Sequence, residues 1–371
     1  MKRLLSVVFA ILVFSSSAAA VHADGIEISA DAFVLYCTDN GEILLPSNVD
    51  SELPIASTTK IMTTLLTLEE AADDNRTVEF TDEMTAEGSS MYLRRGEKVT
   101  LYDLAVGMMM QSGNDAANAA AISIAGSIED FAALMNDKAR QIGMTHTHFV
   151  TPSGLDDEDH YSTAYDMALL MAYALQNEDF AYITSQTSME VHFIYPADKF
   201  ITYPNHNKLL RICDDCIGGK TGYTDAAGRT LVSAARRDGL TLIAVTLNDH
   251  DDWDDHISLY DYGFANYQRE TFHTQELVVD VVGSDRDSVS VCAQEVTAVV
   301  PKDHDAVQTS IMLPPFVYAP VEKGDCIGKA TFSINGKVVA QGDLIASQSA
   351  GYDSRKRSIF ELIKDLLNWH S

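Results

Sequence analysis

Short apolar runs separated by turn residues frame much of the chain and predict two β-hairpins. Residues 32–36 and 42–45 flank Asp39-Asn40-Gly41, a turn sequence typical of hairpins. A second pair of strand-like runs, 229–237 and 240–247, is joined by an Asp-Gly pair. The two hairpins lie far apart in the chain, so one sheet containing both requires the segment between them to fold outside that sheet.

The segment between the hairpins has helical periodicity. Apolar side chains recur at three- and four-residue spacing over 60–70, 101–142 and 164–176, which predicts helices there. We expect a break at Gln111-Ser112-Gly113-Asn114, because these residues favour turns over helix interiors. An outer hairpin, a helical insertion and a closing hairpin predict an α+β fold with an antiparallel sheet flanked by helices.

The pattern changes again near residue 275, where short β-type runs with turn residues between them continue to residue 347. We interpret 273–348 as a small all-β domain and 24–272 as a catalytic domain. The last residues, 354–371, begin with basic side chains, and apolar residues with Trp369 share one helical face. This pattern favours an amphipathic helix in a membrane interface; a helix docked on the protein is the alternative.

The N-terminus is typical of an export signal. Lys2 and Arg3 precede an apolar run over 4–14, and small residues follow up to a cleavage-like sequence at 21–23. The apolar run is too short to span a membrane. We therefore interpret 1–23 as a signal peptide and expect an exported protein.

Charge and composition narrow the classes of partner. The 371 residues are 46% hydrophobic and 22% charged, an ordinary globular balance, and carry a net charge of -28. So acidic a surface repels phosphate backbones, which argues against nucleic acid. No motif requires a cofactor or a metal. The acidic run 249–255 lacks the spacing of a calcium loop, so we interpret it as a solvated loop. Cys213 and Cys216 can form a local disulfide in an exported chain.

Three short motifs occur in one order: S-x-x-K at 57–60, S-x-N at 112–114 and K-T-G at 220–222. About one S-x-x-K is expected by chance in a chain of this length. The ordered set, with the first motif at the start of a predicted helix, instead predicts a serine acyl-transfer site.

Each catalytic residue has a chemical reason. Ser57 is the predicted nucleophile, and a serine hydroxyl needs a base to take its proton. Lys60 follows at i+3 on a helix, so it faces Ser57 and can act as that base once it is neutral. A helix N-terminus and a second cation, Lys220, both lower the pKa of Lys60. Ser112 can relay a proton toward the leaving amine.

The remaining predicted residues bind the substrate. Asn114 can hydrogen-bond a substrate amide, and Gly222 lets the substrate backbone approach the strand edge. Thr221 and Lys220 can bind a carboxylate. Backbone N–H groups of the nucleophile and of Tyr223 are candidate oxyanion donors, each commonly contributing about 2.7–4 kcal/mol to transition-state stabilisation.

Longer stretches around these motifs carry a family resemblance. They are 54–63, 112–117, 160–164, 205–210, 219–228 and 319–324. From about Ala30 to the terminal helix, the chain resembles the low-molecular-mass D-alanyl-D-alanine carboxypeptidases among the penicillin-binding proteins, similar to penicillin-binding protein five. The resemblance implies a β-lactamase/transpeptidase-like fold.

The same resemblance implies an activity in cell wall biogenesis. The enzyme would remove the last D-alanine from peptidoglycan pentapeptide stems through a Ser57 acyl-enzyme. β-Lactams would inhibit it. The export signal and the terminal amphipathic helix, for their part, predict a peripheral location at the outer face of the cytoplasmic membrane. Some relatives place a carboxylate-binding arginine after the last strand of the sheet, whereas 247–253 contains none here.

Other functions share these motifs. A class A-like β-lactamase usually has S-D-N as its middle motif and a deacylating glutamate, whereas this chain has Gly113 and an additional β domain. A non-catalytic peptidoglycan-binding protein would not need the intact motif residues. Endopeptidase and transpeptidase activities use the same chemistry and differ from a carboxypeptidase in the substrate bond or acceptor.

Overall fold

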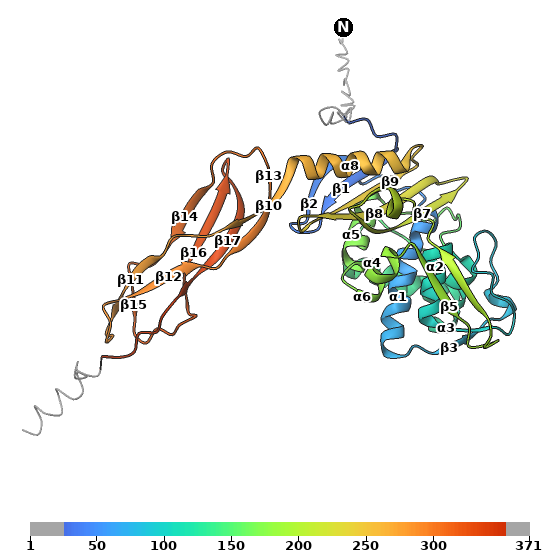
Figure 1. The fold of residues 1–371 in the computed structure, drawn as a ribbon, viewed down its shortest axis with the longest axis horizontal. Helices are drawn as coiled ribbons and strands as arrows, with labels where there is room; N and C mark the ends of the chain where they lie inside the picture. The colour runs from blue at the N-terminus through green and yellow to red at the C-terminus, as the bar shows by residue number, and fades with distance from the viewer. Residues whose placement is uncertain (1–25, 354–371) are drawn as a thin grey trace, which may run out of the picture.

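The central sheet brings the two predicted hairpins side by side (Figure 1). The structure, a computed structural model, describes residues 26–353. All neighbouring strands pair antiparallel, and their order is β2 (Glu42–Ser47), β1 (Ala32–Cys37), β9 (Leu240–Leu247), β8 (Gly228–Arg237), β7 (Cys216–Thr224). The outer hairpin therefore pairs with the closing one, although about 200 residues of chain separate β1 from β9.

Both faces of this sheet are covered, which explains why every residue of β9 is buried. Val34 and Val245 belong to the core shared with the helices of the insertion. Leu35 and Ala244, one position along each strand, belong to a second core beneath α8 (Asp252–Asn266). The two-residue period of the strands thus sends alternate side chains into two separate hydrophobic layers.

The helical insertion is the part of the chain that follows β2 and precedes β7. Its elements are η1 (Ala56–Thr59), α1 (Lys60–Asp73), β3 (Thr77–Glu79), η2 (Asp82–Met84), β4 (Lys98–Thr100), α2 (Leu101–Gln111), α3 (Asn114–Ala125), α4 (Ile128–Ile142), α5 (Ala164–Ala174), α6 (Glu178–Ser185), β5 (Ser188–His192), β6 (Phe200–Pro204) and α7 (Leu209–Ile212). The predicted break between α2 and α3 is confirmed. Ser112 adopts a left-handed backbone conformation with φ of 56°, which ends α2 and turns the chain into α3.

Two parts of this region differ from the sequence prediction. The hairpin formed by β5 and β6 was not predicted, because its strands are short and mostly exposed. The interpretation of 249–255 as a solvated acidic loop is wrong: α8 begins at Asp252. Asp249, Asp252 and Asp255 are all buried. Hydrogen bonds from Ser29 and Arg229 hold these carboxylates, and composition alone did not reveal such distant partners.

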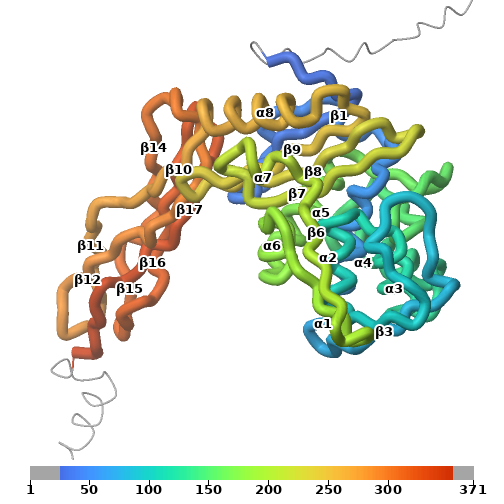
Figure 2. The backbone as a smooth tube through the Cα atoms, turned by 45° about the vertical axis from the view of Figure 1, so that its right-hand side comes forward, coloured from blue at the N-terminus to red at the C-terminus, as the bar shows by residue number. Residues whose placement is uncertain are grey.

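A β-rich part follows α8. β10 (Tyr267–Phe272) pairs with β13 (Val296–Pro301), and a six-stranded sheet lies beside this pair. The order of that sheet is β14 (Gln308–Met312), β16 (Cys326–Ile334), β17 (Lys337–Ala346), β12 (Ser288–Ala293), β11 (Leu277–Val282), β15 (Phe316–Tyr318). Figures 1 and 2 show it to one side of the first sheet, beyond the end of α8.

The two parts meet where β10 and β13 approach the first sheet and α8. Arg269 of β10 forms an ion pair with Asp39 and donates to the Gly239 carbonyl oxygen, and Val299 of β13 packs into the core beneath α8. The Lys302 ammonium donates to the Phe264 carbonyl oxygen at 2.7 Å, and Lys337 forms an ion pair with Glu42. The α+β architecture followed by an all-β part is confirmed. Within residues 26–353 no helix combines the length and apolar character needed to cross a bilayer. The predicted signal peptide, 1–23, and terminal amphipathic helix, 354–371, lie outside the described residues.

Candidate active site

Ser57 lies in η1, immediately before α1, where the chain bends sharply. The preceding residue, Ala56, has a left-handed backbone with φ of 47°, a conformation that L-residues rarely adopt. Gly154 packs directly against it, since a Cβ at Gly154 would collide with the Ala56 carbonyl oxygen. Close packing therefore helps to hold the bend that presents Ser57 at the start of the helix.

Lys60 occupies the position predicted for a base. Its ammonium lies 2.8 Å from Ser57 Oγ and donates to the Ser153 carbonyl oxygen at 2.6 Å. The residue is completely buried, and this burial holds the Lys60 pKa well below its ordinary value. The nearby Lys220 lowers that pKa further, while Asp115 opposes both effects. A neutral amine at this position can accept the Ser57 proton.

Lys220 and Ser112 form a second pair beside the first. The Lys220 ammonium lies 3.1 Å from Ser112 Oγ and also donates to the Thr221 carbonyl oxygen at 2.7 Å. Burial lowers the Lys220 pKa to about 7. Near neutral pH the protonated and neutral forms of Lys220 are therefore both populated. The side chain that accepts its hydrogen bond is Ser112. This arrangement suits proton transfer at Ser112.

Within residues 26–353 the side chain of Asn114 has its amide nitrogen engaged and its oxygen free. Its Nδ2 donates to the Glu87 carbonyl oxygen at 2.7 Å, so that group is already engaged. Its Oδ1 is buried and has no hydrogen-bond partner among the described residues. An unpartnered buried acceptor is costly unless a ligand satisfies it. The free group of Asn114 can therefore accept a hydrogen bond from a substrate N–H.

The predicted residues meet at one cleft of about 320 Å³. Its lining residues are Ser57, Ser89, Ser112, His206, Thr221, Gly222, Tyr223, Arg229, Asp252 and Trp253. Lys60, Lys220 and Asn114 are buried behind this lining. A larger cavity of about 530 Å³, lined by acidic residues around His160, contains neither the serine nor the lysines of the motifs. The smaller cleft is the candidate active site because it holds the reactive groups.

Gly222 places β7 close to the serine. A Cβ at this position would lie 3.0 Å from the Ser57 backbone nitrogen and would collide with Thr230 Oγ1. Only glycine permits this approach without a shift of the neighbouring backbone. The edge of β7 therefore runs beside the nucleophile, and Tyr223 follows directly on that edge.

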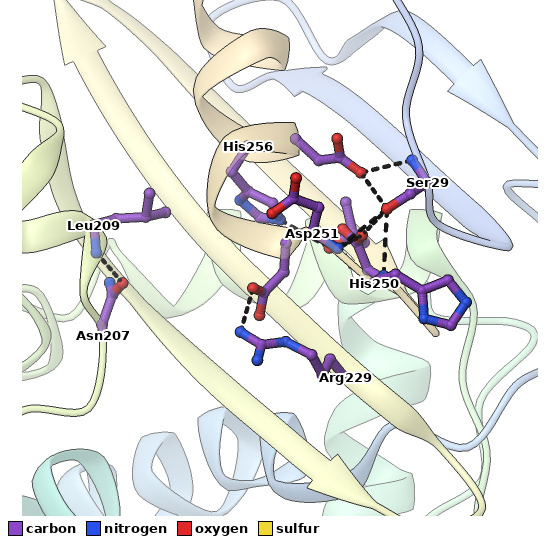
Figure 3. A network of polar contacts seen from close by, with 11 residues as sticks. Ser29, Asn207, Leu209, Arg229, His250, Asp251 and His256 are labelled. Atoms are coloured by element: carbon purple, nitrogen blue, oxygen red, sulfur yellow. Dashed lines mark hydrogen bonds and ion pairs between the residues drawn. The ribbon is translucent and has the colours of Figure 1, made fainter.

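The sequence did not predict that an arginine, Arg229, lines the cleft. Arg229 on β8 and Asp252 at the start of α8 form an ion pair with 2.5 Å between Nη2 and Oδ1. The arginine also lies over Trp253, with Cζ 5.8 Å from the ring centroid. Figure 3 shows Arg229 turned toward α8. Its position in a β-type run indicated only a strand, because no local motif marks its partners.

His160 supports the site from behind. Its Nδ1 accepts from the Val150 N–H at 3.0 Å, so Nε2 carries the hydrogen and donates to Thr59 Oγ1 at 2.8 Å. Burial lowers the His160 pKa to about 4, which keeps the ring neutral. The histidine thus ties η1 to the segment that carries Ser153. Within residues 26–353 no group of three or more His, Cys, Asp or Glu side chains is arranged to hold a metal ion.

Two family profiles match consecutive parts of the chain. The family described as D-alanyl-D-alanine carboxypeptidase matches residues 17–251. The family described as penicillin-binding protein 5, C-terminal domain matches residues 267–351. Together they span the first sheet with its helices and then the β-rich part.

Named relatives cover nearly the same span. The chain is 30% identical to D-alanyl-D-alanine carboxypeptidase DacF of Bacillus subtilis, over 98% of this chain and 97% of that protein. It is 32% identical to DacC of Escherichia coli, over 87% and 84%. A solved structure of penicillin binding protein 5 from Haemophilus influenzae covers 88% of this chain and 98% of its own, with 29% identity and a TM-score of 0.72.

Proposed function

The chain belongs to the D-alanyl-D-alanine carboxypeptidase family, and from this membership we propose that Ser57 is its nucleophile. The protein is a serine-type D-Ala-D-Ala carboxypeptidase of the penicillin-binding protein 5 type, acting in cell wall synthesis. The observation that carries the assignment of Ser57 is its 2.8 Å contact with the buried Lys60 amine. Among the described residues, no other serine hydroxyl has a lysine amine of strongly lowered pKa as its hydrogen-bond partner within the same helical turn.

Acylation begins when neutral Lys60 takes the proton from Ser57 Oγ. The oxygen then attacks the carbonyl carbon between the two D-alanines and forms a tetrahedral intermediate. The C–N bond breaks as Ser112, hydrogen-bonded to Lys220, passes its proton to the leaving amine; the proton that Lys60 took returns to Ser112 Oγ, so both groups are restored and Lys60 is neutral again. The products of this step are free D-alanine and an ester between Ser57 and the shortened stem.

Deacylation restores the serine. Water attacks the ester carbonyl and gives one proton to Lys60, and the bond to Ser57 Oγ breaks as that oxygen recovers a proton. The backbone N–H groups of Ser57 and Tyr223 are the proposed oxyanion donors in both steps. The close approach of β7 at Gly222 supports this assignment, because it brings the two backbone segments together.

Asn114, Thr221 and Gly222 are the proposed substrate contacts. Asn114 Oδ1 supplies an unpartnered acceptor for a stem-peptide amide, and Thr221 and Gly222 line the cleft beside Ser57. Lys220 contributes mainly through Ser112, since its ammonium is buried rather than part of the cleft lining. Peptidoglycan stem peptides are the proposed substrates and β-lactams the proposed covalent inhibitors.

The same proposal includes the location of the protein. A signal peptide at 1–23 would export it, and a catalytic domain at 24–272 and a β-rich domain at 273–348 would follow. An amphipathic helix at 354–371 would hold it at the outer face of the cytoplasmic membrane. Deletion of 354–371 should move the protein from the membrane fraction to the soluble fraction. Unchanged fractionation would refute the peripheral anchor.

A fluorescent penicillin tests the nucleophile. The purified protein should label covalently, and Ser57→Ala should not label. Ser89→Ala is the matched control, because Ser89 lines the same cleft but has no lysine partner among the described residues. Retention of label in Ser57→Ala would assign the nucleophile elsewhere.

Mass analysis of a pentapeptide substrate tests the reaction. Loss of one alanine supports carboxypeptidase activity, whereas a cross-linked product would indicate transpeptidation. Rapid, repeated release of hydrolysed penicillin would favour the β-lactamase alternative.

A further inference from the structure

The cleft contains one permanent positive charge in a strongly acidic protein. The net charge is -28, so an unpaired anion approaching the surface is generally repelled. Arg229 is the only arginine or lysine among the cleft-lining residues in the described part of the chain. His206 also lines the cleft, but partial desolvation and the nearby Lys220 lower its pKa and favour the neutral ring.

The lysines behind the cleft do not supply an equivalent charge. Both are buried, and burial lowers the pKa of each, to about 7 for Lys220. An arginine remains protonated throughout the working pH range, and its planar fork matches a carboxylate. Among the residues that line the cleft, Arg229 is therefore the one best suited to bind an anion.

Register places this charge beside the K-T-G strand. In the antiparallel pairing of β7 with β8, Arg229 lies opposite Tyr223, two positions along from Thr221. Directly opposed side chains lie on the same face of a sheet. The Arg229 side chain is 44% exposed, so it is accessible from the cleft it lines.

Asp252 and Trp253 hold the guanidinium and leave part of it free. Asp252 accepts a hydrogen bond from Nη2, and its side chain is only 4% exposed, so it is held within the protein. Trp253 lies against the planar group. No hydrogen bond to Nε or Nη1 occurs within residues 26–353. Two edges of the donor fork thus stay available to a ligand.

We propose that Arg229 binds the free carboxylate of the terminal D-alanine and that Asp252 is its positioning residue. This inference rests on the proposed function. It assigns to β8 the charge that the segment after β9 lacks, and it gives the enzyme its preference for chain ends. An internal peptide bond presents a neutral amide at this point, which leaves the two free donor edges of Arg229 without a carboxylate, so endopeptidase cleavage is disfavoured.

The test pairs a protein change with a substrate change. Two acyl-D-Ala-D-Ala peptides are compared, one with a free terminal carboxylate and one with a terminal carboxamide. The wild type should prefer the carboxylate substrate. Arg229→Gln should reduce this preference in kcat/KM by about 10- to 100-fold, the effect of losing one charge-assisted pair. The loss should appear mainly in KM.

Arg236→Gln is the matched control. Arg236 lies on the same strand, is exposed, and bonds Thr241 outside the cleft. It should retain the wild-type preference. Asp252→Asn should raise KM for the carboxylate substrate less than Arg229→Gln does, because the charge remains and only its orientation is lost.

Folding defects need a separate check, since Arg229→Gln leaves the buried Asp252 unpaired. The double variant Arg229→Gln/Asp252→Asn removes that buried charge and should show the same reduced preference. An unchanged carboxylate preference in the folded double variant overturns the inference. Wild-type protein that cleaves neither peptide refutes the proposed function and, with it, this inference; a preference that survives the substitutions refutes the inference alone.

Discussion

The part that carries the candidate site and the β-rich part both contain antiparallel sheets, but they bury different groups. Up to Asn266 the described chain buries Lys60, Lys220, Asp115 and His256 among other polar residues. From Tyr267 to residue 353 the only buried polar residue is Ser284. The first part therefore tolerates desolvated ionisable groups, whereas the second does not contain them.

The difference follows from how many layers cover each sheet. Every residue of β9 is buried because helices lie on both faces of its sheet. In the β-rich part, β14 is exposed along its whole length, and β11 alternates between buried and exposed positions. A lysine is desolvated only where several layers exclude water. The first sheet, covered on both faces, can therefore keep a lysine neutral, whereas the sheet of the β-rich part cannot.

The largest expected effect is that of removing the buried base, Lys60, on the rate of acylation. A small effect would contradict the idea that the covered sheet serves to keep a lysine neutral. Lys60→Met should slow acylation by β-lactams about 10²- to 10⁴-fold, the usual contribution of a positioned general base. It should not reduce thermal stability, because it also removes a buried ionisable group. The measurement is the rate of fluorescent penicillin labelling together with thermal unfolding.

Lys329→Met is the control for this prediction. Lys329 is an exposed residue of β16 and should leave the labelling rate unchanged. Equal labelling rates in Lys60→Met and the wild type would remove Lys60 from the chemistry.

A cavity in the β-rich part should affect stability without affecting the chemistry. Leu344 is fully buried in β17, and Leu344→Ala should lower the free energy of unfolding of that part by about 2–5 kcal/mol. Because Leu344 belongs to a hydrophobic cluster confined to the β-rich part, the rate of Ser57 acylation should not change. Denaturant unfolding and penicillin labelling measure the two effects separately.

Val338→Ala is the matched control, since Val338 is a half-exposed residue of the same strand. It should cost much less stability. A large loss of acylation rate in folded Leu344→Ala would show that the two parts are coupled more tightly than their contacts suggest.

The buried Lys220 should give stability a specific pH dependence, which per pH unit is the smallest of the three effects. Its folded pKa is about 7, below the ordinary 10.5, so above pH 7 the unfolded chain binds more protons at this site than the folded chain. Stability therefore rises with pH between about 7 and 10.5, by at most about 1.4 kcal/mol per pH unit. Lys220→Met should remove this rise, as measured by denaturant unfolding at several pH values.

Lys208→Met provides the comparison, because Lys208 is exposed and should leave the pH dependence as it is in the wild type. A slope in Lys220→Met equal to that of the wild type over this range would mean that Lys220 is not the titrating group.

Local patterns predicted much of the fold. The Asp-Gly and Asn-Gly turns indicated both hairpins, and the residues at 111–114 indicated the end of α2, because these preferences act within a few residues. Hairpin β5–β6 and helix α8 escaped prediction. The start of α8 is held by contacts of Ser29 with Asp249 and Asp255, which lie more than 200 residues away, and the strands of β5–β6 are short and mostly exposed.

The residues of the candidate site also fall into those that local patterns predicted and those that only tertiary contacts revealed. The motifs predicted Ser57 and Lys60 as a pair, because residues three apart on a helix share a face whatever surrounds them. Arg229 lies outside every motif, and the segment after β9, where some relatives have a carboxylate-binding arginine, contains none. Strand pairing, which sequence alone does not specify, places Arg229 beside the cleft.

By itself the sequence determined which residues can do chemistry and which neighbours share a helical turn or a hairpin. The tertiary structure decided which of these groups lose their water. Lys60 and Lys220 are ordinary lysines in the sequence, and only the layers of α1, β7 and their neighbours bury them and lower their pKa values. The physical reason is that desolvation depends on every surrounding atom, whereas sequence spacing specifies only the nearest ones.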